Sequence, residues 1–438
     1  MTATAVALFT RDLRVRDNPV LTAAHRDGAV VPLFVLDEGI LAGGGCPPNR
    51  AHFLAAALHE LDTELRDIGG RLVIRSGDIA EQVAAVAAET GAAVVHIAAD
   101  VSDYSRNRER RLRDRLARDH RELRVHTGSL TVIAPGAVVP ANRDHFAVFT
   151  PYFRRWATAE RRPPLRLPRH LDLPPIEPGT LPRPEDLGSG DRSPGLSTGG
   201  EITGRKMLRA WLSHGIHDYA RDSDALAADA TSRLSPYLHF GCLSPTELVR
   251  RADASTAGGA AFVRQLAWRD FHHQVLAARP AAAWSDYRDR AIRWRTDEQA
   301  VAAWTDGRTG FPIVDAGMRQ LRAEGWMPNR ARLIAASFLT KTLRVDWRIG
   351  ARHFLYWLVD ADLADNQLNW QWVAGTGNDT RPNRVLNPLR QAERYDPDGV
   401  YVRRWIPELA DLDGRAAHFP WRGGAADYPA PIAECPGM

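Results

Sequence analysis

The chain has 438 residues, of which 44% are hydrophobic and 25% are charged, and its formal net charge is +4. This length exceeds what one hydrophobic core usually supports and predicts two domains, and the lack of any run of about 18 apolar residues excludes a membrane-spanning helix. The positive charge is nearly all arginine, which suits contacts to phosphate groups, although a GC-rich genome is the simpler explanation of that bias.

Residues 1–150 alternate short apolar runs with helical patterns. The predicted strands are Ala5–Phe9, Val30–Leu36, Arg71–Arg75, Val94–Ala98 and Leu123–His126, and the helical patterns lie at Asn49–Ile68, Ile79–Thr90 and Tyr104–Arg118. Near-continuous apolar strands are typical of a parallel sheet covered on both faces, so this part predicts a doubly wound α/β domain. The opening residues are expected to form the first strand and not a signal peptide. Neither a G-x-G-x-x-G sequence after the first strand nor a P-loop is present, which argues against dinucleotide binding and NTPase chemistry.

Residues 151–204 are rich in proline and predict a long extended linker. Residues 205–421 then show apolar positions at helical spacing with no convincing strand, and residues 422–438 form a short tail. Of the 13 tryptophans, all but Trp156 fall between Trp211 and Trp421. They can fill a helical core, but their density also suits base stacking.

One predicted helix, Ala261–Ala278, has a polar and aromatic side opposite its apolar one. At 100° per residue, Gln265, Trp268, Arg269 and His272 lie together within about 100°. Such a face predicts a docking site, and a half-buried tryptophan with a solvated polar rim explains it equally well.

The turn Thr231–Pro236 combines three hydroxyl groups with an arginine before a proline. This composition suits a phosphate-binding turn, although ordinary helix caps look similar and are commoner.

An acidic segment that begins at Asp360 places Asp362, Asn366 and Trp370 on one helix face at i, i+4 and i+8. Its carboxylates need partners, such as Arg332 or a polar cofactor. With no His or Cys at ligand spacing in this segment, a metal is not expected.

The three cysteines, Cys46, Cys242 and Cys435, are far apart and have no metal-ligand spacing. We therefore expect a reducing, cytoplasmic setting.

Seven segments match, in order along nearly the whole chain, the motifs of one protein family: RDLRVRDNP (11–19), TSRLSPYLHFG (231–241), WRDFHHQ (268–274), TGFPIVDAGMRQL (309–321), GWMPNRARLIAASFLTK (325–341), DWRIGARHF (346–354) and LNWQWVAGTGNDTRPNRVLNP (368–388). The chain resembles the photolyase/cryptochrome family, and within it the bacterial class I cyclobutane pyrimidine dimer photolyases of the deazaflavin-antenna type. The resemblance implies an α/β antenna domain, a long linker and an all-helical domain that holds U-shaped FAD, active as FADH⁻.

The resemblance also assigns the FAD contacts. It implies that the phosphates meet Tyr219, Thr231, Ser232, Arg233, Leu234 and Ser235, and that the flavin meets Arg269, Arg332, Asp360, Asp362 and Asn366. Arg332 is expected to pair with Asp360. Asn366 is expected to face flavin N5, where an amide cannot supply a proton; plant-type cryptochromes carry Asp there, so Asn366 favours repair over signalling.

For the reaction, the resemblance implies an electron relay through Trp370, Trp347 and Trp294 that reduces photoexcited FAD. The partner it implies is UV-damaged DNA whose pyrimidine dimer flips into a pocket. The implied DNA contacts are Gln265, Trp268, Arg269, Asn329, Arg330, Leu333, Trp372 and Gln391. Light then drives an electron from reduced FAD to the dimer, the cyclobutane ring splits, and the electron returns.

Three residues depart from the family pattern. Gln265 stands where dimer photolyases commonly have Glu, Leu333 replaces a usual Met, and Pro328 replaces a usual His. These changes leave open weaker repair, a shifted substrate or a cryptochrome-like FAD photoreceptor without repair, which is the alternative reading. The histidine pair of (6-4) photolyases is absent, so that substrate is not implied. A light-independent nucleic-acid-binding module would not explain the FAD motifs.

The α/β domain carries the antenna positions Phe34, Arg50, Asp100 and Ser102, which match the deazaflavin-binding type. We expect 8-hydroxy-5-deazaflavin there, with methenyltetrahydrofolate or an empty vestigial pocket as the alternatives. The protein is expected to be a monomer.

Overall fold

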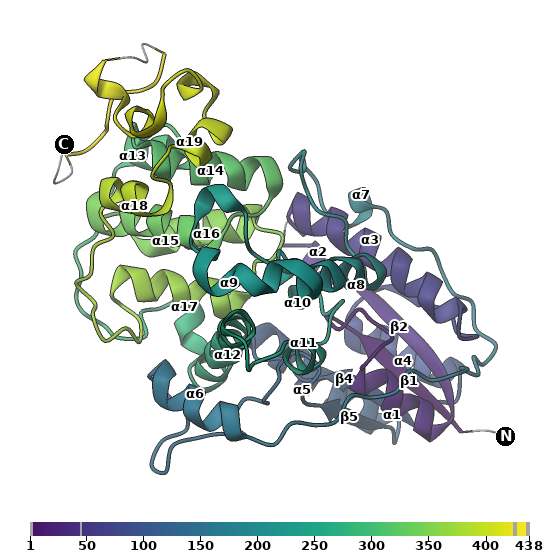
Figure 1. Ribbon diagram of the computed structural model, residues 1–438. Helices are drawn as coiled ribbons and strands as arrows, with labels where there is room; N and C mark the ends of the chain where they lie inside the picture. Colours follow the sequence, from purple (N-terminus) through teal and green to yellow (C-terminus); the bar gives the residue numbers. More distant parts are fainter. Residues whose placement is uncertain (1–2, 44–45, 424–426, 435–438) are drawn as a thin grey trace.

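The α/β and helical parts of the chain lie side by side in the computed structural model, which describes residues 3–43, 46–423 and 427–434 (Figure 1). The N-terminus lies at the outer end of the α/β part, and the C-terminal segment lies at the opposite end of the helical part. Cys435 falls outside the described residues, whereas Cys46 and Cys242 are free thiols. No helix in the described ranges is both long and apolar enough to cross a membrane.

The N-terminal sheet has five parallel strands in the order β3-β2-β1-β4-β5. The strands are β1 (Thr4–Phe9), β2 (Ala29–Asp37), β3 (Val73–Gly77), β4 (Val94–Ala98) and β5 (Glu122–His126). Val6 of the central strand is in register with Val31 on one side and Val95 on the other. Strand order reverses between β1 and β4, and the carboxyl ends of these two strands open the crevice where ligands bind in such folds.

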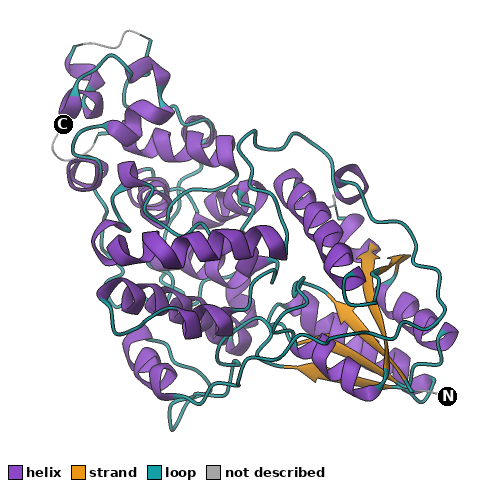
Figure 2. Cartoon of the chain, turned by 45° about the vertical axis from the view of Figure 1, so that its right-hand side comes forward, coloured by secondary structure: helices purple, strands orange, loops and turns teal. Residues whose placement is uncertain are grey.

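Helices cover both faces of the sheet, which confirms the predicted doubly wound domain (Figure 2). Apolar residues of α1 (Pro19–Asp27) and α3 (Pro48–Arg66) pack on one face, and those of α4 (Ile79–Glu89) and α5 (Asp103–Arg118) pack on the other. A single turn, α2 (Glu38–Leu41), follows β2. The periodicity did not indicate α1, which begins after the side chain of Asn18 caps its first backbone amides.

The segment predicted as an extended linker from residue 151 begins as a helix, α6 (Phe149–Thr158), because Phe149, Tyr152 and Trp156 form a buried aromatic stripe along it. Proline is tolerated in the first turn of a helix, so Pro151 does not break it. The extended chain that follows contains one short helix, α7 (Pro184–Leu187), and Pro178 accepts a backbone hydrogen bond from Ile74 of the edge strand β3. The linker therefore covers a sheet edge that would otherwise be open.

The C-terminal part is all-helical, as predicted. Its helices are α8 (Glu201–Ala210), α9 (Ile216–Asp222), α10 (Ser235–His239), α11 (Pro245–Arg251), α12 (Ala257–Ala278), α13 (Glu298–Thr305), α14 (Pro312–Glu324), α15 (Asn329–Ser337), α16 (Trp347–Trp357), α17 (Leu363–Ala374), α18 (Pro388–Tyr395) and α19 (Val400–Trp405). Wider π-helical turns continue two of them, at Trp211–Gly215 and Phe338–Thr342, and short 3₁₀ turns lie at Leu226–Ala228, Pro280–Ala283, Pro407–Leu409, Gly414–His418 and Pro420–Arg422.

Residues 11–19, which follow β1, connect the α/β domain to the helical domain through ion pairs and hydrogen bonds. Arg11 forms ion pairs with Asp100 of the α/β domain and Asp362 of the helical domain. Arg14 is 1% exposed and donates to the backbone oxygens of Gly241 and Ser129. Because a buried guanidinium needs acceptors on every side, this charged motif specifies the domain interface.

Candidate functional site

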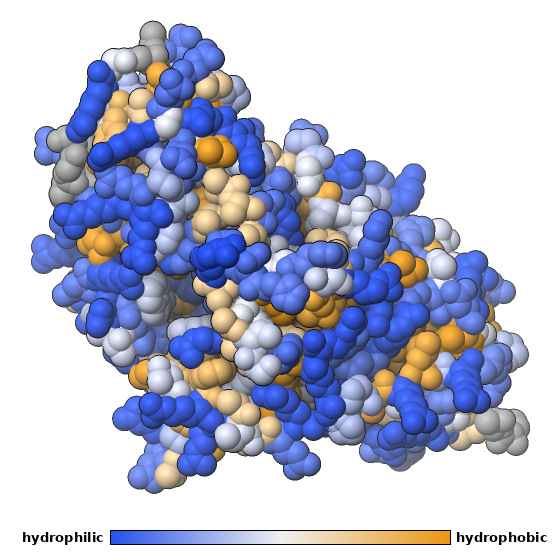
Figure 3. All heavy atoms as spheres, viewed as in Figure 1, coloured by the Kyte–Doolittle hydropathy of each residue, from blue (hydrophilic) through white to orange (hydrophobic). Residues whose placement is uncertain are grey.

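A cavity of about 410 Å³ lies inside the helical domain and is called here the helical-domain cavity. Its walls come from α9, the turn before α10, α12, the start of α15 and α17. The lining includes the predicted residues Tyr219, Thr231, Ser232, Arg233, Ser235, Gln265, Trp268, Arg269, Asn329, Arg332, Leu333, Asp360, Asp362 and Trp372. Hydrophilic residues dominate the visible surface of the molecule, where apolar ones form only small patches (Figure 3).

The long helix α12 supplies one wall through its polar and aromatic face. Gln265, Trp268, Arg269 and His272 all line the cavity, as their common helix face predicts. The back of the Trp268 indole stacks on Phe149 of α6, with ring centroids 3.7 Å apart and planes 6° apart. Trp268 is thereby held as a rigid wall with one face free.

The turn before α10 brings hydroxyl groups to the cavity. Arg233 adopts a left-handed conformation with φ of 50°, and its guanidinium is bound by Asp229 and Glu324. Its charge is thus already balanced, so anion binding by this turn falls to Thr231, Ser232 and nearby backbone amides. Burial raises the pKa of Tyr219 to about 12, which keeps that phenol a neutral donor at the cavity rim.

A small chamber of about 70 Å³ continues from this cavity and shares Arg332, Asp360 and Asp362 with it. Asn366 and Trp370 line the chamber. The Asn366 amide nitrogen donates to the backbone oxygen of Ala351 (3.1 Å) and to Gln367 Oε1 (2.9 Å). Its amide oxygen, an acceptor, is left for a ligand that donates a hydrogen bond.

Arg332 and Asp360 form an ion pair at 2.8 Å at the mouth of the chamber. The second oxygen of Asp360 is buried without a hydrogen-bond partner, and so are Thr231 Oγ1 and His239 Nδ1. Buried polar atoms without partners are costly, so their concentration around one cavity fits a large polar ligand that would satisfy them. An elongated cofactor with a phosphate group at one end and a polar ring at the other matches these donors and acceptors.

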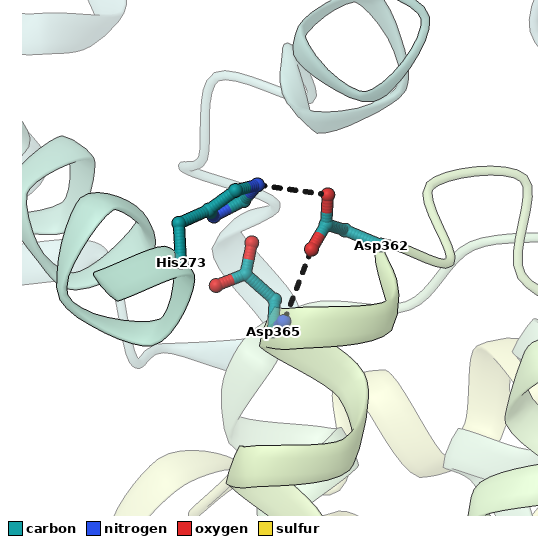
Figure 4. A group of neighbouring side chains, drawn as sticks. All are labelled: His273, Asp362 and Asp365. Atoms are coloured by element: carbon teal, nitrogen blue, oxygen red, sulfur yellow. Dashed lines mark hydrogen bonds and ion pairs between the residues drawn. The ribbon is translucent and has the colours of Figure 1, made fainter. Parts of the chain in front are cut away.

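His273, Asp362 and Asp365 have the side-chain types of a metal site and lie close together (Figure 4). However, one carboxylate oxygen of Asp362 accepts hydrogen bonds from backbone amides of α17, and the other pairs with Arg11. A guanidinium nitrogen of Arg11 also lies 3.2 Å from His273 Nε2. Although burial alone would raise it, His273 and Arg11 hold the pKa of Asp362 well below its ordinary value. This group is therefore an ion-pair network that already contains its cation.

Two of the three predicted relay tryptophans are buried. Trp370 is 2% exposed and Trp347 is fully buried in the same hydrophobic cluster, against which half-buried Trp294 packs. A Cβ atom at Gly350 would lie 2.1 Å from the Trp370 ring, so glycine is required where α16 crosses α17. Trp294 lies beside the loop after residue 343, because Arg295 pairs with Val345 in an isolated bridge.

Several predicted residues lie outside these two cavities. Leu234 is buried in the hydrophobic core, and Gln391 lies on α18 with a buried, unpartnered oxygen. Arg330 is bound by Asp224 and lies over the ring of Tyr395. These residues do not line the helical-domain cavity in this structure.

A separate cavity of about 350 Å³ opens at the carboxyl ends of β1, β2 and β4 and is called here the interdomain cavity. It brings together all four predicted antenna positions, Phe34, Arg50, Asp100 and Ser102. Sequence reasoning did not include Arg11 and Arg108, which also line it. Its other wall comes from the helical domain and includes His239 and Asp362, which also line the helical-domain cavity.

The parallel sheet with a crevice at its switch point, joined to a helical domain with its own polar cavity, defines a two-domain protein with two neighbouring cofactor-sized sites. Residues 5–170 match the family model "DNA photolyase", and residues 262–436 match "FAD binding domain of DNA photolyase". The chain belongs to the DNA photolyase family.

The similarity extends over whole chains. A deoxyribodipyrimidine photo-lyase of Streptomyces griseus is 57% identical, over 98% of this chain and 96% of that protein. The crystal structure of a cryptochrome from Synechocystis sp. PCC6803 matches with a TM-score of 0.90 at 31% identity, covering 99% and 96% of the two chains. An archaeal photolyase from Sulfolobus tokodaii, solved with two FAD molecules, matches with a TM-score of 0.86 at 30% identity, covering 98% and 96%.

Proposed function

We propose that this protein repairs cyclobutane pyrimidine dimers in UV-damaged DNA under blue or near-ultraviolet light. The observation that carries the proposal is the helical-domain cavity with its adjoining chamber, where Asn366 lines the chamber, the Arg332–Asp360 pair borders both spaces, and the partly exposed Trp268 and Trp372 line the larger one. Similarity over the whole chain to a deoxyribodipyrimidine photo-lyase supports the same activity. A cryptochrome shares the fold, so the dimer pocket and Asn366 favour the enzyme over a photoreceptor.

FAD is the cofactor that fits the cavity. When bound in its reduced form, FAD supplies on excitation the electron that splits the cyclobutane ring and then regains it. Thr231, Ser232 and Tyr219 donate to its phosphates, and Arg332 and Asp360 hold its ring. The free oxygen of Asn366 would accept a hydrogen bond from N5–H of the reduced ring, and the amide would supply no proton of its own.

The DNA contacts follow from the same cavity. A dimer turned out of the helix enters between Trp268 and Trp372, whose indoles replace lost base stacking. Gln265 is exposed at this entrance and can both donate to and accept from a pyrimidine edge. Asn329, Arg330, Leu333 and Gln391 complete the proposed surface. Arg330 must exchange Asp224 for a phosphate when DNA binds.

Trp370, Trp347 and Trp294 form the proposed route by which an electron reaches photoexcited, oxidised flavin. Their order runs from the chamber wall through the buried core to the half-buried surface. Each transfer moves the positive charge outward, away from the flavin.

We also assign the interdomain cavity to an antenna pigment, 8-hydroxy-5-deazaflavin in preference to methenyltetrahydrofolate. The Nε atoms of Arg50 and Arg108 are buried there without hydrogen-bond partners, and burial lowers the pKa of both guanidinium groups. An anionic chromophore would satisfy both groups. The functional units we propose are an antenna domain (1–150), a linker (151–204), a catalytic domain (205–421) and a tail (422–438), acting as a cytoplasmic monomer.

Arg50→Ala should lower the affinity for added deazaflavin about tenfold, because it removes a charged donor from a buried site. The measurement is a titration of purified protein with the pigment, followed by its absorbance. Arg66→Ala, at the far end of the same helix and paired with Asp62 alone among the described residues, is the matched control and should bind normally. Unchanged pigment binding in Arg50→Ala would mean that the pigment site lies elsewhere.

In the central experiment, purified protein with its flavin in the reduced state is mixed with a UV-irradiated oligonucleotide, and the loss of dimers under blue light is measured. We expect measurable repair by the natural protein, and Gln265→Glu should change the yield only several-fold, because the charge-assisted character of one hydrogen bond contributes about 1 kcal/mol. Tight dimer binding without splitting would favour a photoreceptor. A protein that cannot be reconstituted with FAD would refute the proposed function.

A further inference from the structure

His272 and Asp365 form a hydrogen-bonded pair in the wall of the helical-domain cavity, and the proposed function assigns no role to this pair. His272 is 5% exposed, and its Nδ1 lies 2.8 Å from Asp365 Oδ1. Both residues line the cavity, and the His272 ring lies 5.7 Å from that of Trp268. The pair therefore stands beside the indole against which the dimer is expected to stack.

The contact with Asp365 fixes which nitrogen of His272 a ligand meets. A carboxylate accepts, so Nδ1 must carry a proton, and Nε2 remains for the cavity. Within the described residues, Nε2 of His272 has no hydrogen bond to the protein. Nε2 accepts when the imidazole is neutral and donates when it is protonated.

Charged groups of both signs lie around His272. Asp365 is its direct partner, and Asp362 lies on the same helix turn. Figure 4 shows the Asp365 carboxylate beside the His273 ring as well. Arg269 on α12 and Arg11 from the α/β domain supply opposing positive charges, and Arg11 is paired with Asp362.

Gln265 and His272 occupy opposite ends of the same helix face. They are seven residues apart on α12, or about 10.5 Å along its axis, with Trp268 between them. A ligand stacked on Trp268 therefore has Gln265 at one end and His272 at the other. Gln265 is neutral and can offer only an uncharged hydrogen bond.

We propose that His272, held by Asp365, is a second catalytic contact to the flipped-out dimer and gives a dimer carbonyl oxygen the charge-assisted hydrogen bond that Gln265 does not provide. This rests on the proposed repair function. When an electron reaches the dimer, negative charge develops on that oxygen and the bond from Nε2–H strengthens. The proton stays on His272, and the two carbon–carbon bonds of the ring break. The electron then leaves the dimer, so no proton or electron is consumed.

The first test measures dimer binding in the dark with full-length protein and oxidised flavin. The probes are an oligonucleotide with one thymine dimer and its undamaged twin, compared from about pH 6 to about pH 8, because the proposed contact needs a proton on both ring nitrogens of His272. The preference for the dimer should fall as pH rises. His272→Phe should lower that preference about tenfold at the acidic end and remove its pH dependence.

Three further variants distinguish loss of the proposed contact from loss of folding. His272→Gln keeps a neutral polar group and should bind with intermediate preference and no pH dependence. Asp365→Asn should shift the pH profile to lower pH, because the neighbouring negative charge is lost. His217→Phe, at an exposed histidine of α9, should match the natural protein. An unchanged preference and pH profile in His272→Phe would overturn the proposal.

The second test is rescue. Gln265→Glu introduced into His272→Phe should restore most of the lost splitting yield, because a protonated carboxyl group at this position can donate to a dimer carbonyl oxygen. No rescue, or loss of FAD from His272→Phe in a titration of apoprotein while dimer preference is retained, would assign the pair to the cofactor and refute a dimer contact. If the natural protein neither binds nor splits dimers, the proposed function fails first and this contact fails with it.

Discussion

Replacing Trp370 with phenylalanine should abolish the light-driven reduction of bound, oxidised flavin. Trp370 lines the chamber with Asn366 and is 2% exposed, so it is the indole next to the proposed flavin ring. Phenylalanine preserves an aromatic ring in the packing, but benzene is much harder to oxidise than indole. The measurement is the loss of oxidised-flavin absorbance under blue light with an external reductant.

The same Trp370→Phe protein should still split dimers once its flavin is reduced chemically, because repair uses an electron that is already on the flavin. Trp304→Phe is the matched control. Trp304 is fully buried, with its ring centroid 6.0 Å from that of Trp370, but it lies outside the proposed route. Its variant should retain photoreduction. Equal loss of photoreduction and repair in Trp370→Phe would instead identify Trp370 as a packing residue.

Asp270→Ala should lower the free energy of unfolding by about 3 kcal/mol, because it leaves three buried donors without an acceptor. Asp270 is 1% exposed and accepts from the backbone amides of Val132 (3.2 Å) and Ile133 (2.8 Å) and from the indole of Trp156 (2.8 Å). This one carboxylate ties α12 to α6 and to the segment that leaves the α/β domain. Urea unfolding followed by tryptophan fluorescence measures the loss.

Asp218→Ala is the control for this experiment, since Asp218 is 58% exposed and pairs only with Arg221. Its unfolding free energy should stay within about 0.5 kcal/mol of the natural value. If Asp270→Ala proves as stable as this control, water or local rearrangement satisfies the three donors, and Asp270 does not hold the domains together.

The sequence predicted well those features that depend on neighbouring residues. Strands β1, β2 and β4 are near-continuous apolar runs, β3 and β5 are more polar, and all five were located to within two residues of their observed starts. The functional face of α12 was also visible, because a helix repeats every 3.6 residues and Gln265, Trp268, Arg269 and His272 must then share a side. The N-terminal part of the linker was predicted wrongly from residue 151 to residue 158. There the proline-rich composition hid the aromatic stripe of α6.

The roles assigned to individual site residues came from family resemblance. Composition and spacing alone were compatible with several functions for the polar helix faces that line the cavity. Local patterns show which side of an element is polar, but they do not show what it meets. Arg11 and Asp362 are 351 residues apart, and His272 and Asp365 are 93 apart. Only folding decides such pairs, because a buried charge takes whichever partner the packing of distant elements brings within reach. The sequence by itself therefore determined the two domains, their elements and the polar face of α12. The tertiary structure decided that this face and the His272–Asp365 pair border the helical-domain cavity, and that Arg11 lines the neighbouring interdomain cavity.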